Sequence, residues 1–348
     1  MAGRSSRRKG EGSERIKALV EDKLAEGLQY EALQLYRGLV SRKSSRGDHD
    51  GAAAAAEQGI GVLIRGGVVD SATELGNVLV GIYADNQLPV TEERLDVIKR
   101  VNETYEDTKR AAVLAAEDAR KVEGPTSSGG GESGDEIVDA DDQEEAERTQ
   151  PIGILQIRFL KQAVAWTARR GKWIHGDPGI CTLLGRCFWG EGKGNQGIKY
   201  LVLGEKPQEL CDILWEKLPK KPERYTPQKK RLVYSPAASR EVAITQGALH
   251  FAAMENLRDA NALQEAYKQR CPKGDSQGPL PTFCRLLLKT CEYDAAPVFQ
   301  KLVELYKPSL EKEPSILAVV ETIAKKFFGI QMRPPSALEN IMGMLSAT

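Results

Sequence analysis

The sequence predicts an all-α protein, a right-handed α-solenoid built from degenerate helical hairpins. Apolar residues recur at spacings of three and four along nearly the whole chain, as they do on one face of an α-helix. Glycine and turn residues interrupt this pattern at short intervals, so the predicted helices come in pairs. Alternation of β-branched and polar residues, which is typical of strands, is almost absent.

The N-terminal part contains five apolar stripes with helical spacing. They cover residues 16–24, 32–40, 60–64, 72–83 and 95–105. Gly27 and the pair Gly66–Gly67 separate paired stripes, as glycine does at helix C-termini. Thr91 is placed to cap the fifth helix, and acidic Glu92 follows in its first turn.

Helical spacing resumes in the C-terminal part after residue 150. The stripes cover residues 155–166, 180–188, 198–202, 210–214, 249–263, 283–306 and 316–327, and a short amphipathic tail covers 338–345. The turn Gly176-Asp177-Pro178 separates the first two of them. No strict period of about 34 residues, the tetratricopeptide (TPR) length, aligns over the pairs, so we expect TPR-like but degenerate repeats.

Residues 122–150 differ from the rest of the chain and predict a disordered acidic insertion. Residues 123–147 contain ten acidic and no basic side chains and show no apolar period. Such a stretch cannot bury enough apolar surface to offset its ordering entropy. Lys+Arg and Asp+Glu both number 49, so the remaining chain carries a net charge of +10. The insertion could screen this basic body, occupy one of its docking faces or keep it soluble.

These observations predict four segments. They are a disordered basic N-terminus (1–13), N-terminal helical repeats (14–121), the acidic insertion (122–150) and C-terminal helical repeats (151–348). The N-terminus lacks the apolar core of a signal peptide, and no apolar run reaches the roughly 18–20 residues of a membrane span. The six cysteines form no Cys-x-x-Cys pair. We therefore expect a cytosolic protein with reduced cysteines.

The motifs that resemble catalytic or cofactor sites have simpler explanations. Gly129/Gly131/Gly134 and Gly192/Gly194/Gly197 both match G-x-G-x-x-G, but neither follows a predicted strand as a dinucleotide site requires. His49, His175 and His250 do not pair at helical metal-site spacing. The sequence therefore predicts no enzymatic activity, no cofactor and no metal site.

A basic loop over residues 217–231 supports an alternative, an RNA-associated helical-repeat scaffold. Six cations lie close to Tyr225 and Tyr234 and could hold RNA by charge and stacking: Lys220, Lys221, Arg224, Lys229, Lys230 and Arg231. A solvated loop or a protein-docking edge would have the same composition, and no nucleic-acid module is recognisable, so nucleic acid is the weaker prediction.

Several segments resemble, in consistent order, the Golgi-to-ER-traffic protein four family, the α-solenoid adaptors of the tail-anchored membrane-protein targeting pathway. The matching segments, spread over about residues 15–347, are QYEALQLYRGLVSR from Gln29, GGVVDSATELGNVLVGIY from Gly66, GKWIHGDPGICTLLGRCFWGEGKGNQGIKYLVLGE from Gly171 and AKKFFGIQMRPPSALENIMGMLSA from Ala324. The acidic insertion after Val122 and Pro335, where the family often has Gln, depart from the family pattern.

The resemblance implies a non-enzymatic scaffold for delivery of tail-anchored proteins to the endoplasmic reticulum. In the family, N-terminal helical pairs hold a targeting ATPase, and C-terminal pairs hold a ubiquitin-like adaptor that brings a TPR co-chaperone indirectly; no direct membrane insertion is implied. At the positions of this chain that match the family's segments, the resemblance implies these ATPase-binding residues: Tyr36, Arg37, Arg42, Asp70 and Glu74. The residues carried over for the ubiquitin-like partner are Phe327, Phe328, Gly329, Pro334, Leu338 and Met342.

Overall fold

The structure is a computed structural model that describes residues 15–122, 151–217, 236–271 and 278–332. All regular structure in these residues is helical, so the predicted all-α fold of paired helices is confirmed. Packing divides the chain into two compact units, Met1–Lys193 and Gly194–Thr348.

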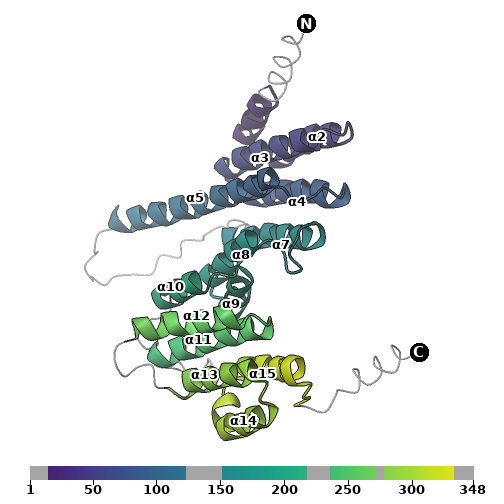
Figure 1. The fold of residues 1–348 in the computed structure, drawn as a ribbon. Coiled ribbons are helices and arrows are strands. Elements are labelled where there is room, and N and C mark those ends of the chain that lie inside the picture. Colours follow the sequence, from purple (N-terminus) through teal and green to yellow (C-terminus); the bar gives the residue numbers. More distant parts are fainter. Residues whose placement is uncertain (1–14, 123–150, 218–235, 272–277, 333–348) are drawn as a thin grey trace, which may run out of the picture. The chain divides into compact units, whose positions relative to one another are not determined.

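The first unit consists of helices that pack against their neighbours in the chain. Residues 15–25 are helical, and the following helices are α2 (Gln29–Ser44), α3 (His49–Arg65), α4 (Val69–Asp85), α5 (Glu92–Val122), α7 (Ile152–Arg170) and α8 (Pro178–Gly190). α3 packs between α2 and α4, and α7 packs on both α4 and α5 although the insertion precedes it in the chain (Figure 1).

The second unit follows the same plan with shorter helices at its start. It contains α9 (Gly194–Leu203), α10 (Pro207–Lys217), α11 (Pro236–Ala253), α12 (Leu257–Arg270), α13 (Pro279–Glu292), α14 (Ala296–Leu310) and α15 (Pro314–Phe328). α11 is its central helix, because it contacts α9, α10, α12, α13 and α15.

The turns of the first unit repeat every twenty residues, a period that the sequence analysis missed. Gly27, Gly47, Gly67 and Gln87 each have a left-handed backbone, with φ of 76°, 76°, 79° and 55°. After α3, the Val68 N–H donates to Leu63 O (2.9 Å) and the Gly67 N–H to Ile64 O (3.0 Å), which is the Schellman pattern of helix termination. One helix and one turn therefore form the structural repeat.

The same turn in the second unit uses residues other than glycine. Glu205, Glu255 and Asp294 have φ of 54°, 63° and 48°. Gly192, the first glycine of the second G-x-G-x-x-G match, occupies the equivalent position between α8 and α9 with φ of 69°. That motif is thus part of a helix–turn–helix connection, as its lack of a preceding strand predicted.

Large aromatic side chains fill the core of the first unit. The Tyr83 and Trp166 rings lie 4.8 Å apart between α4 and α7, and the Tyr105 and Phe159 rings lie 6.1 Å apart between α5 and α7. All four side chains are buried, and the Tyr105 hydroxyl pairs with the Thr73 hydroxyl at 2.8 Å. These contacts fix α4, α5 and α7 to one another.

α5 extends well beyond the residues that the apolar stripe predicted. Among the α5 residues whose side chains the structure describes, Tyr105 is the last that is buried, yet the helix continues to Val122 with residues 110–115 exposed. The extension carries Val113 and Leu114 on its surface. The predicted insertion thus begins where a helix ends, and residues 123–150 lie outside the described residues.

The predicted division of the chain by partner, with the insertion as the boundary, stays a prediction. The division by packing is different: it lies between Lys193 and Gly194, so α7 and α8 belong with the N-terminal helices. The physical reason is that the aromatic side chains of α7 complete the core under α4 and α5.

Candidate interaction surfaces

The first candidate surface is formed by α2 and α4, which contact each other across α3. The Arg37 guanidinium on α2 lies 3.5 Å from the Glu74 carboxylate on α4, and both side chains are exposed. Two of the residues predicted for a partner surface are therefore neighbours, although 37 positions separate them in the chain.

Beside this ion pair lie two adjoining hollows of about 510 Å³ each, which we call the α2/α4 groove. Both hollows are lined by Arg37, Ser44, Val78 and Ile82. The remaining lining is mostly small or polar: Gln34, Gly38, Val40, Ser41 and Ser45 from α2 and its end, Glu74, Asn77, Gly81, Asp85 and Asn86 from α4 and its end, and Gln162 from α7.

The groove presents hydrogen-bonding atoms rather than a strong field of one sign. The Asn77 Oδ1 atom is buried and has no hydrogen-bond partner among the described residues, whereas the Asn86 amide donates to Ile82 O at 2.8 Å. One cation, Arg37, is balanced by Glu74 and Asp85. Such a lining suits a protein segment that supplies hydrogen-bond donors, because a buried unpaired carbonyl is costly.

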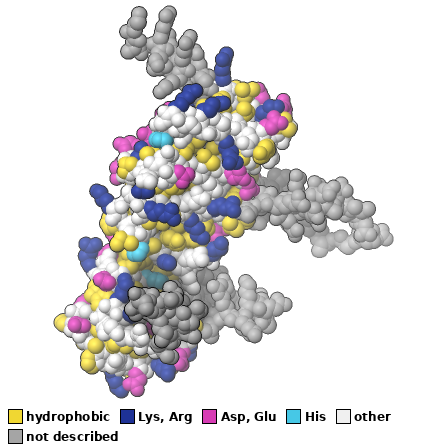
Figure 2. Space-filling model, turned by 90° about the vertical axis from the view of Figure 1, so that its right-hand side faces the viewer, with side chains coloured by type: hydrophobic (Ala, Val, Ile, Leu, Met, Phe, Trp, Pro, Cys, Tyr) yellow, Lys and Arg dark blue, Asp and Glu magenta, His cyan; other side chains and the backbone are white. Residues whose placement is uncertain are grey.

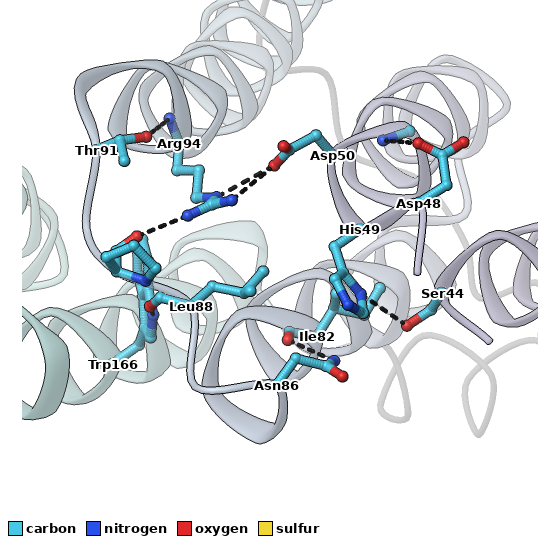
Figure 3. A network of polar contacts seen from close by, with 12 residues as sticks. Ser44, Asp48, His49, Asp50, Ile82, Asn86, Leu88, Thr91, Arg94 and Trp166 are labelled. Carbon is cyan, nitrogen blue, oxygen red and sulfur yellow. Dashed lines mark hydrogen bonds and ion pairs between the residues drawn. The ribbon is translucent and has the colours of Figure 1, made fainter. Parts of the chain in front are cut away.

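A polar network holds the end of the stack next to the groove (Figure 3). The Arg94 guanidinium donates to the Asp50 carboxylate through Nε and Nη2, both at 3.1 Å, and to Pro89 O through Nη1 at 2.9 Å. The Trp166 indole N–H donates to Leu88 O at 3.3 Å. These bonds connect α3, the α4–α5 loop, α5 and α7, so the groove has a fixed frame.

The remaining predicted residues of this surface have different positions. Asp70 is exposed and lies one turn before Glu74, on the same side of α4. Arg42 is exposed but lies five residues beyond Arg37, which places it on a different face of α2. Tyr36 is 0% exposed and packs in the core beside Gly59, beneath the surface that Arg37 and Glu74 form.

The second candidate surface lies at the end of α15. The Phe328 ring is 4.8 Å from the Phe299 ring of α14 and 6.3 Å from that of Phe327, and both residues of the Phe327–Phe328 pair are half-buried. Gly329 ends α15 with φ of 65°, and the Ile330 N–H donates to Ala324 O at 3.0 Å. This glycine therefore has a structural role as a helix cap. Pro334, Leu338 and Met342 lie outside the described residues.

An exposed apolar row on α14 was not predicted from the sequence. Leu305 is 73% exposed, and Val298, seven residues earlier and so on the same face, is also exposed. Tyr293, in the turn before α14, is exposed as well. Apolar spacing alone did not reveal this row, because it has the same period as the buried face of α14, which contains Phe299 and Leu302.

The described residues contain no group of three or more His, Cys, Asp or Glu side chains that could hold a metal ion. The six cysteines are free thiols. Burial raises the pKa of Cys181, Cys187, Cys284 and Cys291 to about 12, which disfavours the nucleophilic thiolate at neutral pH. The basic loop proposed for RNA, residues 218–231, lies outside the described residues, apart from Lys217 at the end of α10.

No described helix is both long enough and apolar enough to cross a lipid bilayer. On the face shown in Figure 2, basic and acidic side chains are interspersed with hydrophobic ones. This face therefore carries no single charged field.

Comparison with known proteins extends the resemblance to nearly the whole chain. The profile of the family described as Golgi to ER traffic protein 4 matches residues 46–347. The chain is 22% identical over 336 residues to the Golgi to ER traffic protein 4 homolog of Dictyostelium discoideum, covering 96% of this chain and 88% of the relative. It is 23% identical over 325 residues to Protein GET4 of Arabidopsis thaliana, covering 90% and 89%.

A solved structure has the same fold. The crystal structure of C. therm. Get4 matches with a TM-score of 0.63 at 21% identity, covering 96% of this chain and 95% of that one. The profile match spans well over half of the chain. The chain belongs to the Golgi to ER traffic protein 4 family.

Proposed function

We propose that the chain is a non-enzymatic adaptor in the delivery of tail-anchored membrane proteins to the endoplasmic reticulum. It would hold a targeting ATPase on its first unit and a ubiquitin-like adaptor on its second, and the latter would bring a TPR co-chaperone indirectly. The names of its relatives place them in Golgi-to-ER traffic. A scaffold of this kind accelerates handover by raising the effective concentration of one partner near the other.

The ATPase surface that we propose is the α2/α4 groove with its Arg37–Glu74 ion pair. The observation that carries this assignment is that two predicted contact residues meet, at 3.5 Å, at the edge of a groove large enough for side chains of a partner. Asp70 extends the same side of α4. The partner segment would exchange the exposed ion pair for its own charged groups and donate a hydrogen bond to Asn77 Oδ1.

The proposed surface for the ubiquitin-like partner is the end of α15, with Phe327 and Phe328 as apolar anchors. Half-buried aromatic side chains supply large contact area at low entropic cost, which is why they are enriched in binding hot spots. The exposed α14 row, Val298 and Leu305, lies in the same unit and is a second apolar surface on which this partner could bind.

The proposal is tested by binding of the full chain to each purified partner. Arg37→Glu should weaken ATPase binding at least about tenfold and leave the ubiquitin-like partner unaffected, because a reversed charge opposes the partner's complementary group. Phe327→Ser should weaken binding of the ubiquitin-like partner at least about tenfold and leave ATPase binding unaffected. Arg100→Glu is the control, because the exposed Arg100 forms an ion pair between two other helices, with the partly buried Glu57 across α5 and α3.

A charge swap separates contact from structure. The double variant Arg37→Glu/Glu74→Arg keeps an ion pair of opposite orientation and should remain defective in ATPase binding. If it restores full affinity, the pair only holds α2 against α4 and the groove is not the contact surface. If Arg37→Glu or Phe327→Ser abolished binding of both partners while thermal stability stayed unchanged, the assignment of separate surfaces would be contradicted.

A further inference from the structure

The loop between α7 and α8 exposes an apolar pair among cations. Ile174 is 87% exposed and Trp173 is 47% exposed, although side chains of this kind are usually buried. Arg169, Arg170 and Lys172 immediately before them are exposed as well. We call residues 169–174 the RK-WI loop.

The loop is fixed in this exposed position by bonds at its base. The Asp177 N–H donates to the Thr167 hydroxyl at 3.0 Å, and the Gly176 N–H donates to Trp173 O at 3.1 Å. Gly176 has φ of 96°, and a Cβ there would lie 2.9 Å from Val164 O. These contacts hold the backbone on the C-terminal side of Trp173 and Ile174 in place.

The cations of the loop are not neutralised within the described part of the chain. Arg169, Arg170 and Lys172 make no ion pair with another described residue. Asp177, the acidic residue in the same connection, caps α8 by accepting from the Ile180 N–H at 3.0 Å. Positive charge beside an exposed Trp and Ile calls for a ligand that is acidic and carries small apolar side chains.

One segment of this chain has that chemistry. Ile137 and Val138 are flanked by Asp135, Glu136 and Asp139, inside the stretch of ten acidic and no basic residues. We propose that residues 132–147 dock on the RK-WI loop, with their carboxylates on the cations and Ile137–Val138 on Trp173 and Ile174. The proposal goes beyond the adaptor function and does not depend on it.

The chain length permits this contact. α7 starts at Ile152, and its 19 residues place the loop about 28 Å from that start. The roughly 13 residues between Val138 and Pro151 reach up to about 43 Å when extended. On the other side, the roughly 15 residues from Val122 to Ile137 reach up to about 50 Å when extended. The 31 residues of α5 span about 46 Å, so this side also reaches the loop when nearly extended. A lipid surface is less favoured, because one short cationic loop falls short of the two signals that stable membrane anchoring takes.

The first experiment measures the accessibility of Trp173 in the full chain by acrylamide quenching. The Trp173→Phe variant is subtracted to isolate this side chain from the three other tryptophans. Replacing Asp135, Glu136, Asp139, Asp141 and Asp142 by Asn or Gln should raise quenching of Trp173 about twofold at low salt, and 0.5 M salt should do the same to the native chain, because both remove the attraction. Equal quenching in all three conditions would overturn the proposal.

The second experiment uses a labelled peptide of residues 132–147 added to the neutralised full chain. It should bind, and Arg170→Gln/Lys172→Gln should weaken binding at least about tenfold, because two of the three opposing charges are lost. Arg158→Gln, an exposed cation elsewhere on α7, is the control and should have no effect. Equal binding to both variants would contradict the proposal. Shielding of Trp173 by anionic phosphatidylserine vesicles, but not by the peptide, would also overturn it and indicate a lipid ligand.

Discussion

The Arg37 guanidinium on α2 lies 3.5 Å from the Glu74 carboxylate on α4, and both helices also pack against α3. Neither side chain is buried, and both line a groove whose walls are small and polar. An exposed pair of this kind contributes little to folding, typically below about 1 kcal/mol. Its place at the edge of a groove therefore suggests recognition rather than stability, and Arg37→Ala should lower the unfolding free energy by less than about 1 kcal/mol in urea titrations.

Close helix packing at Gly59 predicts that adding one methyl group there lowers the stability of the first unit. A Cβ at Gly59 of α3 would lie 2.6 Å from Leu75 Cδ2 and 2.7 Å from the Tyr36 ring. Gly59→Ala should therefore destabilise the first unit by about 1–3 kcal/mol, measured by urea unfolding. Gly61→Ala, two residues on, meets only the end of Arg65 and should stabilise α3 by about 0.5–1 kcal/mol. Equal effects at the two positions would show that α2, α3 and α4 are not packed this closely.

The left-handed turns predict opposite effects at Gly67 and Gln87. Gly67 has φ of 79° with open space around it. Gly67→Ala should therefore lower the free energy of unfolding by about 1 kcal/mol, through backbone strain alone. Gln87 has φ of 55°. Gln87→Gly should therefore raise the free energy of unfolding by up to about 1 kcal/mol, because glycine adopts this backbone conformation without strain. Gln87→Ala keeps the strain and serves as the control. Thermal unfolding in which Gln87→Gly is no more stable than Gln87→Ala would contradict the shared turn geometry.

His250 predicts a pH dependence in the second unit. Burial, with a smaller contribution from the charge of Lys199, lowers the pKa of His250 to about 4 from the model-peptide value of 6.5. As pH falls below 6.5 the unfolded chain takes up the proton first, so stability is lost between pH 6.5 and 4 and is fully present above pH 7. The free energy of unfolding should fall by at most about 3 kcal/mol over this pH range.

The measurement is urea unfolding between pH 7.5 and 4, followed for the full chain. His250→Gln removes the titrating group and should flatten this part of the pH profile. A profile that keeps its slope in His250→Gln would assign the pH dependence to other groups.

The helices were predictable from the sequence because the apolar residues that form the stripes are the ones that become buried. Leu95, Ile98, Val101 and Tyr105, for example, are all core residues of α5. The twenty-residue period was missed because the turn position holds glycine at 27, 47 and 67 but glutamine at 87. Spacing between glycines, rather than a tetratricopeptide consensus, was the usable signal.

The candidate surfaces were only partly predictable. Arg37 and Glu74 were selected by resemblance, but their proximity depends on how α3 spaces α2 from α4, which no local pattern encodes. Tyr36 was selected with them although it is a core residue, because a tyrosine next to an arginine looks the same in a sequence whether it points inward or outward. The exposure of Trp173 and Ile174 was likewise not readable from composition.

The central claim is that one chain holds two partners at separate surfaces, and a ternary binding measurement tests it most directly. The full chain is saturated with the ubiquitin-like partner and then titrated with the nucleotide-bound ATPase by calorimetry, with the complex mass checked by light scattering. The account predicts a complex of all three proteins and an ATPase affinity within about twofold of that of the free chain, because two sites that share no residues and no partners bind independently. Displacement of one partner by the other, or binding of neither, would contradict it.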